Sequence, residues 1–101
     1  MGNIMASKSI VQDSKECWVC GTTLSLQRHH VFYGNANRRL SEKYGCWVWL
    51  CGRHHTGNVG VHFSPDMDSK LKKYTQECFE NQCGTREDFR AIFGKSYLDM
   101  I

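Results

Sequence analysis

The sequence predicts an α+β fold, in which a short two-stranded hairpin packs against C-terminal helices. Two segments, 27–33 and 46–50, are rich in the β-branched and aromatic residues that favour strands. Farther along, Ser64-Pro65-Asp66 has the chemistry of a helix start. All five histidines and four of the six cysteines lie between residues 17 and 62, around the two strand segments. This clustering indicates that the hairpin carries metal chemistry.

The size and composition of the chain fit one small intracellular domain. A chain of 101 residues forms a core that is only modestly stabilising, so a structural metal would help it fold. No apolar run approaches the ~20 residues that span a bilayer, so we expect no membrane contact. The first residues lack the apolar stretch of a signal peptide, and we therefore expect a cytoplasmic protein. In a reducing compartment, paired cysteines favour metal binding over disulfides.

The first half of the chain is expected to form a tail and then a hairpin. Residues 1–14 are polar and show no helical or strand periodicity of apolar residues. They are therefore predicted to form a flexible tail before a domain over residues 15–101. The first strand, 27–33, ends at Gly34, and the second strand occupies 46–50. Between them, 35–44 is polar and basic, which predicts a loop with a helical turn at 39–44.

The second half is expected to form two helices after an irregular turn at 52–60. Ser64 is a good N-cap, Pro65 suits the first helical position, and the helix should end near Gly84. Its apolar face should comprise Met67, Leu71, Tyr74 and Cys78, with Phe79 beside them. A shorter helix should begin at Thr85 and stop at Gly94, with its apolar face formed by Phe89, Ile92 and Phe93.

Two Cys/His pairs have the spacing of a structural zinc site. Cys17 and Cys20 are separated by two residues, as are Cys51 and His54, and two such pairs make one closed four-ligand site. Cys46 is the alternative to His54, but it lies within a strand and has no partner two residues away. Cys78 and Cys83 are expected to be packing residues. A redox role for the first pair lacks the βαβ context that it needs.

Four histidines remain after the zinc ligands are assigned: His29, His30, His55 and His62. Adjacent strand residues point to opposite faces, so His29 and His30 cannot easily bind the same ion. One of them can bind a metal while the other acts on a water or a substrate from a different direction. Hydrolysis needs this division between an electrophile and a base.

The order Cys-x-x-Cys, then His-His on a strand, then Cys-x-x-His-His after the next strand, resembles the HNH endonucleases, the ββα-metal or His-Me finger superfamily. The resemblance covers about residues 17–75. It implies a small ββα-metal, treble-clef-like hairpin with a structural zinc, and hydrolysis of DNA phosphodiester bonds. Small HNH proteins of this form are frequent in phages and prophages, so the expected setting is the cytoplasm of a bacterial or phage-infected cell.

The resemblance also implies roles for the remaining histidines. By position, His29 and His55 resemble the ligands of a catalytic divalent ion, Mg or Mn, and His30 resembles the general base. His62 resembles a later histidine that is a further ligand in some members and contacts the phosphate in others. The products would carry 5′-phosphate and 3′-hydroxyl ends. Basic residues expected to contact DNA phosphates are Arg38, Arg39, Lys70, Lys72 and Lys73.

The sequence departs from the family pattern at two places. The middle Asn usually precedes the second strand, where this chain has Gly45-Cys46, and the sequence does not choose among Asn35, Asn37 and Asn58 as a substitute. The stretch 57–60 interrupts the metal-binding helix, so His55 is expected on a first turn and the main helix from Pro65. The alternative is a non-catalytic treble-clef zinc module that binds nucleic acid or protein. That module would need no further histidines.

Overall fold

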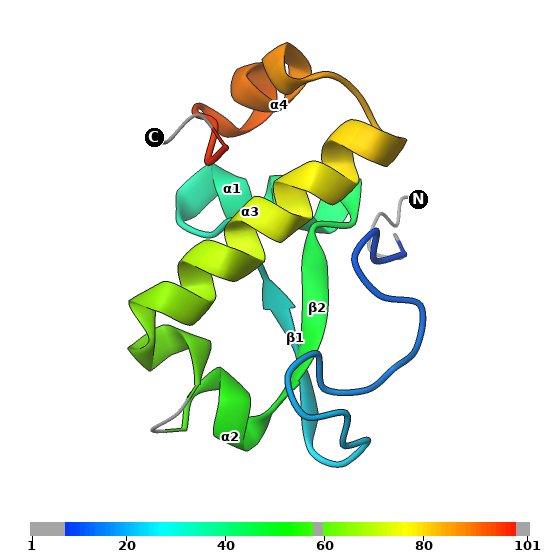
Figure 1. The fold of residues 1–101 in the computed structure, drawn as a ribbon, viewed down its shortest axis with the longest axis vertical. Helices are drawn as coiled ribbons and strands as arrows, with labels where there is room; N and C mark the ends of the chain where they lie inside the picture. The colour runs from blue at the N-terminus through cyan, green and yellow to red at the C-terminus, as the bar shows by residue number, and fades with distance from the viewer. Residues whose placement is uncertain (1–7, 58–59, 99–101) are drawn as a thin grey trace.

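A computed structural model describes residues 8–57 and 60–98, and it confirms the α+β class. An antiparallel pair of strands, β1 and β2, stands at the centre of the molecule, with helices on one side and at both ends (Figure 1). In chain order the elements are β1 (Leu26–His30), α1 (Asn35–Tyr44), β2 (Trp47–Cys51), α2 (Gly52–His55), a 3₁₀ turn (Val61–Phe63), α3 (Pro65–Gln82) and α4 (Arg86–Phe93).

The hairpin ends earlier than the sequence predicts. In its register His29 faces Val48 and His30 faces Trp47, and β1 stops at His30 rather than at Tyr33. The next two residues, Val31 and Phe32, are buried. The backbone of Phe32, however, forms hydrogen bonds with the side chain of Ser41 and not with a neighbouring strand. The Ser41 hydroxyl donates to the Phe32 carbonyl at 2.7 Å and accepts from the Phe32 N–H at 3.1 Å. This pair of bonds turns the chain from β1 into α1.

The connection between the strands is a full helix, α1, where the sequence predicts a loop with one helical turn. Gly45 ends it in the left-handed conformation, with a φ of 76° that glycine adopts without strain. Besides Ser41, its partly buried residues Leu40 and Tyr44 pack against the core. The helix thus depends on contacts with the hairpin and α4 that the local sequence does not reveal.

Both C-terminal helices are where the sequence predicts them. The Ser64 side chain accepts from the Met67 N–H at the start of α3, and Thr85 and Asp88 form a reciprocal capping box at the start of α4. One detail differs, because Tyr74 is 45% exposed rather than buried. The buried face of α3 instead includes Leu71 and Phe79, together with the polar residues Thr75 and Gln76.

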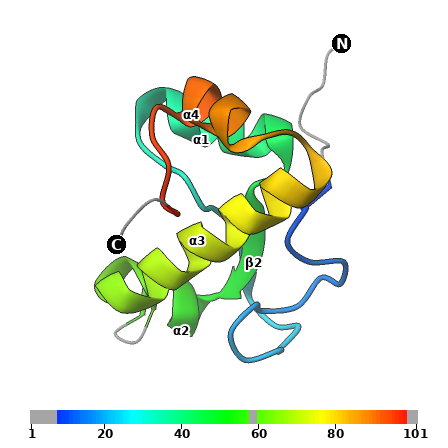
Figure 2. The same ribbon diagram turned by 45° about the horizontal axis from the view of Figure 1, so that its top comes forward.

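The core lies where α3 crosses the hairpin and meets α1 and α4 (Figure 2). Its centre is aromatic. The centroid of the Phe32 ring lies 5.1 Å from the centroid of the Phe89 ring and 4.8 Å from that of the Phe93 ring. Such edge-to-face and tilted pairs add to the gain from burying apolar area. α2 lies at the opposite end of the hairpin from this cluster. No helix within residues 8–57 and 60–98 is long and apolar enough to cross a membrane.

Part of the segment that the sequence assigns to a tail contacts the second strand. The Ser9 hydroxyl donates to the Trp47 carbonyl at 2.5 Å, and the Trp49 N–H donates to the Gln12 side chain at 2.6 Å. These bonds fall on the edge of β2 that β1 leaves open. They cover that edge, and the folded unit therefore begins before residue 15. Residues 1–7 lie outside the described part of the chain.

Candidate metal centres

The predicted zinc ligands, Cys17, Cys20, Cys51 and His54, come together in the structure, with donor atoms that all lie within 4.8 Å of one another. The sulfurs of Cys20 and Cys51 are 3.9 Å apart, and His54 Nδ1 lies 3.3 Å from Cys51 Sγ and 3.8 Å from Cys17 Sγ. With Zn–S of about 2.3 Å and Zn–N of about 2.0 Å, a tetrahedral site has edges of about 3.8 Å and about 3.5 Å. The four donors thus match a structural zinc site.

Local backbone structure positions each of these four donors. The turn from Cys17 closes with a bond from the Gly21 N–H to the Cys17 carbonyl at 2.8 Å, and Gly21 has a φ of 78°. Cys51 is the last residue of β2, and His54 follows on α2. Burial raises the pKa of the Cys17 thiol, but backbone N–H groups around it outweigh burial and lower the pKa overall. A thiolate, the form that binds zinc, is therefore favoured there.

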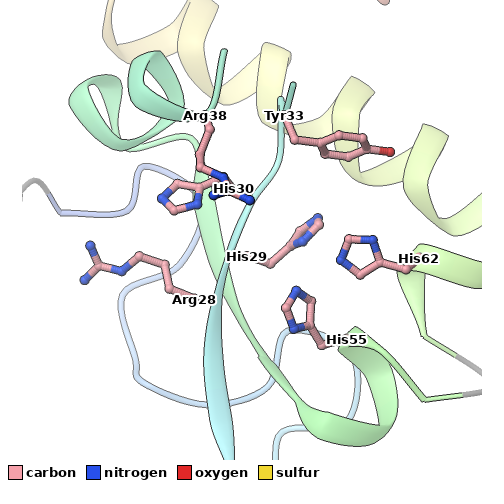
Figure 3. A pocket seen from close by; sticks show the side chains of 7 residues that line it. All are labelled: Arg28, His29, His30, Tyr33, Arg38, His55 and His62. Carbon is pink, nitrogen blue, oxygen red and sulfur yellow. The ribbon is translucent and has the colours of Figure 1, made fainter. Parts of the chain in front are cut away.

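A second set of donors comprises His29, His55 and His62, whose ring nitrogens also lie within 4.8 Å of one another. Figure 3 shows the three rings pointing toward a common centre from β1, α2 and the 3₁₀ turn. The ring centroids are 5.3 Å apart for His29 with either partner and 4.8 Å apart for His55 with His62. The structure thus places His62, whose role the sequence leaves open, beside the other two.

Gly60 makes this approach of the 3₁₀ turn to α2 possible. A Cβ atom at this position would lie 2.7 Å from the backbone oxygen of His55 and 2.8 Å from the backbone carbon of His54. Only glycine avoids these contacts, because any larger residue would push the turn away from α2. The Gly60 N–H also donates to the Gly57 carbonyl at 2.9 Å, which closes the bend. His62 follows two residues later and reaches His55.

His29 has the environment of a metal ligand rather than of a hydrogen-bonded core residue. It is 3% exposed, and its Nε2 atom has no hydrogen-bond partner. A buried polar atom without a partner is costly, so it needs an explanation such as an ion. Burial, together with charge repulsion from the nearby rings of His55 and His62, lowers the pKa of His29 to about 3. His29 is therefore neutral at physiological pH, as a metal-binding imidazole must be.

His30 lies on the other side of β1, as the alternation of strand residues predicts (Figure 3). Its Nε2 atom is 2.7 Å from the Glu42 carboxylate of α1. The Arg28 guanidinium donates to the other oxygen of the same carboxylate at 2.5 Å. Glu42 is the residue near the site that the sequence analysis misses. No motif marks it, because its partner His30 lies twelve residues earlier in the chain.

A cleft of about 330 Å³ joins the two sides of β1. It is lined by Arg28, His29, His30, Tyr33, Arg38, His55 and His62. The expected base, the three clustered histidines and one of the expected phosphate contacts, Arg38, thus share one opening. Among the described residues, Cys46, Cys78 and Cys83 belong to no metal set. Cys46 and Cys78 are buried, as predicted, but Cys83 is exposed and is therefore not a packing residue.

The basic residues expected to contact DNA differ in how accessible their charges are. Arg38, Arg39, Lys70 and Lys73 are exposed. Lys72 is instead 16% exposed, forms an ion pair with Asp68 at 2.9 Å and lies 4.4 Å from the centre of the Tyr33 ring. Although its burial opposes the charge, Asp68 raises the pKa of Lys72. The ammonium of Lys72 is therefore engaged within the protein rather than available to a DNA phosphate.

Three comparisons with known proteins found no relative of this chain: no family model, no curated protein and no solved structure matches it.

Proposed function

We propose that the protein is a metal-dependent endonuclease of the HNH type, which hydrolyses phosphodiester bonds in DNA. The observation that carries the proposal is the cluster of three histidines around the unpartnered Nε2 atom of His29, with His30 on the opposite side of the same strand. The zinc set alone would serve a non-catalytic module of treble-clef type equally well. Such a module has no use for a buried histidine whose Nε2 atom has no hydrogen-bond partner.

The proposed fold type rests on the order of the elements around the two sets. The paired strands β1 and β2 supply His29 and Cys51, and α2 supplies His54 and His55 in succession. This arrangement supports a ββα-metal hairpin of treble-clef type. The helical part is split, since α2 is a single turn and α3 begins only at Pro65. The split agrees with the interruption that the sequence predicts over residues 57–60.

The residues of the cleft can divide the hydrolytic reaction among them. His29, His55 and His62 would hold a divalent ion, which when bound neutralises charge on the phosphate oxygens. His30 would accept a proton from water, since neutral imidazole is a base near physiological pH. The water oxygen then forms a bond to phosphorus, and the bond from phosphorus to the 3′ oxygen breaks. The released 3′ oxygen takes a proton from solvent, and Arg38 would contact the phosphate.

The donor set predicts which metal activates cleavage. Three imidazole nitrogens suit Co²⁺ and Ni²⁺ best; Mn²⁺ binds nitrogen donors less tightly than these ions but more readily than Mg²⁺, which prefers oxygen ligands. Zinc-loaded protein should therefore nick supercoiled plasmid DNA faster with Mn²⁺ than with an equal concentration of Mg²⁺. The assay follows the conversion of supercoiled to relaxed plasmid for each ion. Equal rates with Mg²⁺ would contradict the donor argument. No cleavage of any DNA form with any ion would refute the nuclease and favour the zinc module.

DNA binding should depend on the exposed arginines of α1. Each phosphate contact contributes a slope of about 0.9 to the fall of log affinity with log salt concentration. Replacing Arg38 and Arg39 with alanine should therefore reduce this slope by up to about 2 and weaken binding at low salt. The measurement is fluorescence anisotropy with a labelled duplex over a series of salt concentrations. Arg90→Ala, which removes a charge from α4, should leave the slope unchanged. If the double variant binds like the unmodified protein, the DNA lies elsewhere.

A further inference from the structure

Two contacts, with His30 and Arg28, help to fix the position of the Glu42 carboxylate. Its Oε1 atom faces His30 Nε2 at 2.7 Å, and its Oε2 atom accepts from Arg28 at 2.5 Å. The side chains of His30 and Glu42 are 22% and 20% exposed, so water competes only partly for this interaction. Because each oxygen has its own partner, the carboxylate cannot rotate without losing at least one of these contacts.

Arg28 is itself held in place by the second strand. Its guanidinium lies 3.7 Å from the centre of the Trp47 ring and 5.3 Å from the centre of the Trp49 ring. Contacts of this kind between a cation and an aromatic face are attractive and restrict the guanidinium. Arg28 and His30 point to the same side of β1, because they are two residues apart on a strand. A chain of contacts thus runs from Trp47 through Arg28 and Glu42 to the ring of His30.

We infer that Glu42 is a positioning residue that holds His30 in the tautomer with the proton on Nε2. A carboxylate can only accept, so a neutral His30 must donate its ring proton from Nε2 to Glu42. Nδ1 is then the one ring atom that can take a proton from water. The inference deepens the proposed function, because it names what orients the proposed base. This chain lacks the middle Asn that usually precedes the second strand, and Glu42 would orient the base without it.

The tautomer can be measured without any cleavage assay. In zinc-loaded protein labelled with ¹⁵N-histidine, at a pH where imidazole is neutral, His30 should show the Nδ1 shift of an unprotonated nitrogen and the Nε2 shift of a protonated one. The signals are assigned from their loss in His30→Gln. In Glu42→Ala the two shifts should move toward each other as the tautomers mix. Glu42→Gln keeps an oxygen acceptor and should retain the tautomer of the unmodified protein.

Cleavage provides the second measurement. Glu42→Ala should lower kcat by about tenfold or more, with less effect on KM for DNA, and Glu42→Gln should recover much of the loss. Glu77→Ala, which removes the same charge from an exposed position on α3, is the matched control and should change neither shifts nor rates. A proton on Nδ1 of His30 in the unmodified protein, or unchanged shifts in Glu42→Ala, would overturn the inference. If the shifts behave as expected but no variant cleaves DNA, the proposed function is wrong and the role of Glu42 toward His30 stands.

Discussion

Replacing His30 with alanine should lower metal-dependent DNA cleavage by roughly a hundredfold or more while the protein still binds Mn²⁺ and DNA. His30 lies on the side of β1 away from the three clustered histidines, so its removal takes away a proton acceptor and no metal ligand. The measurement is plasmid nicking at saturating Mn²⁺, alongside calorimetric titration of Mn²⁺ into the same variant. Normal cleavage by His30→Ala would mean that another group is the base.

The ligand variants are the matched comparison for this result. His29→Ala should lose both Mn²⁺ affinity and cleavage, but it also leaves a hole at a position that is almost completely buried. His55 and His62 are more exposed, so His55→Ala and His62→Ala remove a donor with less loss of packing. Both should weaken Mn²⁺ binding and cleavage together, unlike His30→Ala. A His62→Ala variant with normal Mn²⁺ affinity would remove His62 from the ligand set.

Loss of a zinc ligand should strongly destabilise the domain. The apparent free energy of zinc binding to small structural sites is about 10–16 kcal/mol, as large as the whole stability of an ordinary domain, about 5–15 kcal/mol. Cys20 is an exposed ligand, so Cys20→Ser removes a donor without disturbing the core, and Cys17→Ser should act in the same direction. Elemental analysis should find one tightly held zinc in the unmodified protein and less in each variant. Circular dichroism should show that each variant unfolds at a lower temperature.

Cys83→Ser provides the control for this experiment, because Cys83 is exposed and belongs to neither metal set. It should keep one tightly held zinc and the melting temperature of the unmodified protein. A strong chelator should unfold the unmodified protein and the Cys83→Ser variant alike. Full stability of Cys20→Ser without bound zinc would show that the fold does not depend on the metal.

The features that the sequence predicts well are those that short spacings determine. Cys17 and Cys20 can face one ion because only two residues separate them, and Ser64 caps α3 through a backbone group three residues away. The opposite directions of His29 and His30 follow from strand alternation alone. None of these inferences needs contacts between distant parts of the chain, so pattern and propensity were sufficient.

The features that the sequence misses depend on contacts between distant residues. The α1 segment is polar and lacks a side-chain N-cap, and its Ser41 is bound to Phe32, nine residues earlier. Glu42 acts on His30 across twelve residues, so no local motif marks it. Lys72 is a basic residue in a helix by sequence, and the rings of Tyr33 and Tyr97 that lie over its ammonium come from distant parts of the chain. Contacts between residues that lie far apart in the chain cannot be predicted from the composition of the sequence or from its hydrophobic periodicity.

The two candidate metal centres use ligands that are adjacent in the chain, since His54 belongs to the zinc set and His55 to the histidine set. Both residues lie on the single turn α2, so an ion bound by His54 would also limit where His55 can go. If both centres bind an ion, the two occupancies would be linked in thermodynamic terms, and linkage is reciprocal. If zinc raises the affinity of the histidine set for its ion, that ion must raise the affinity for zinc by the same factor. The supply of zinc would then govern the second centre allosterically, through the backbone of one helical turn.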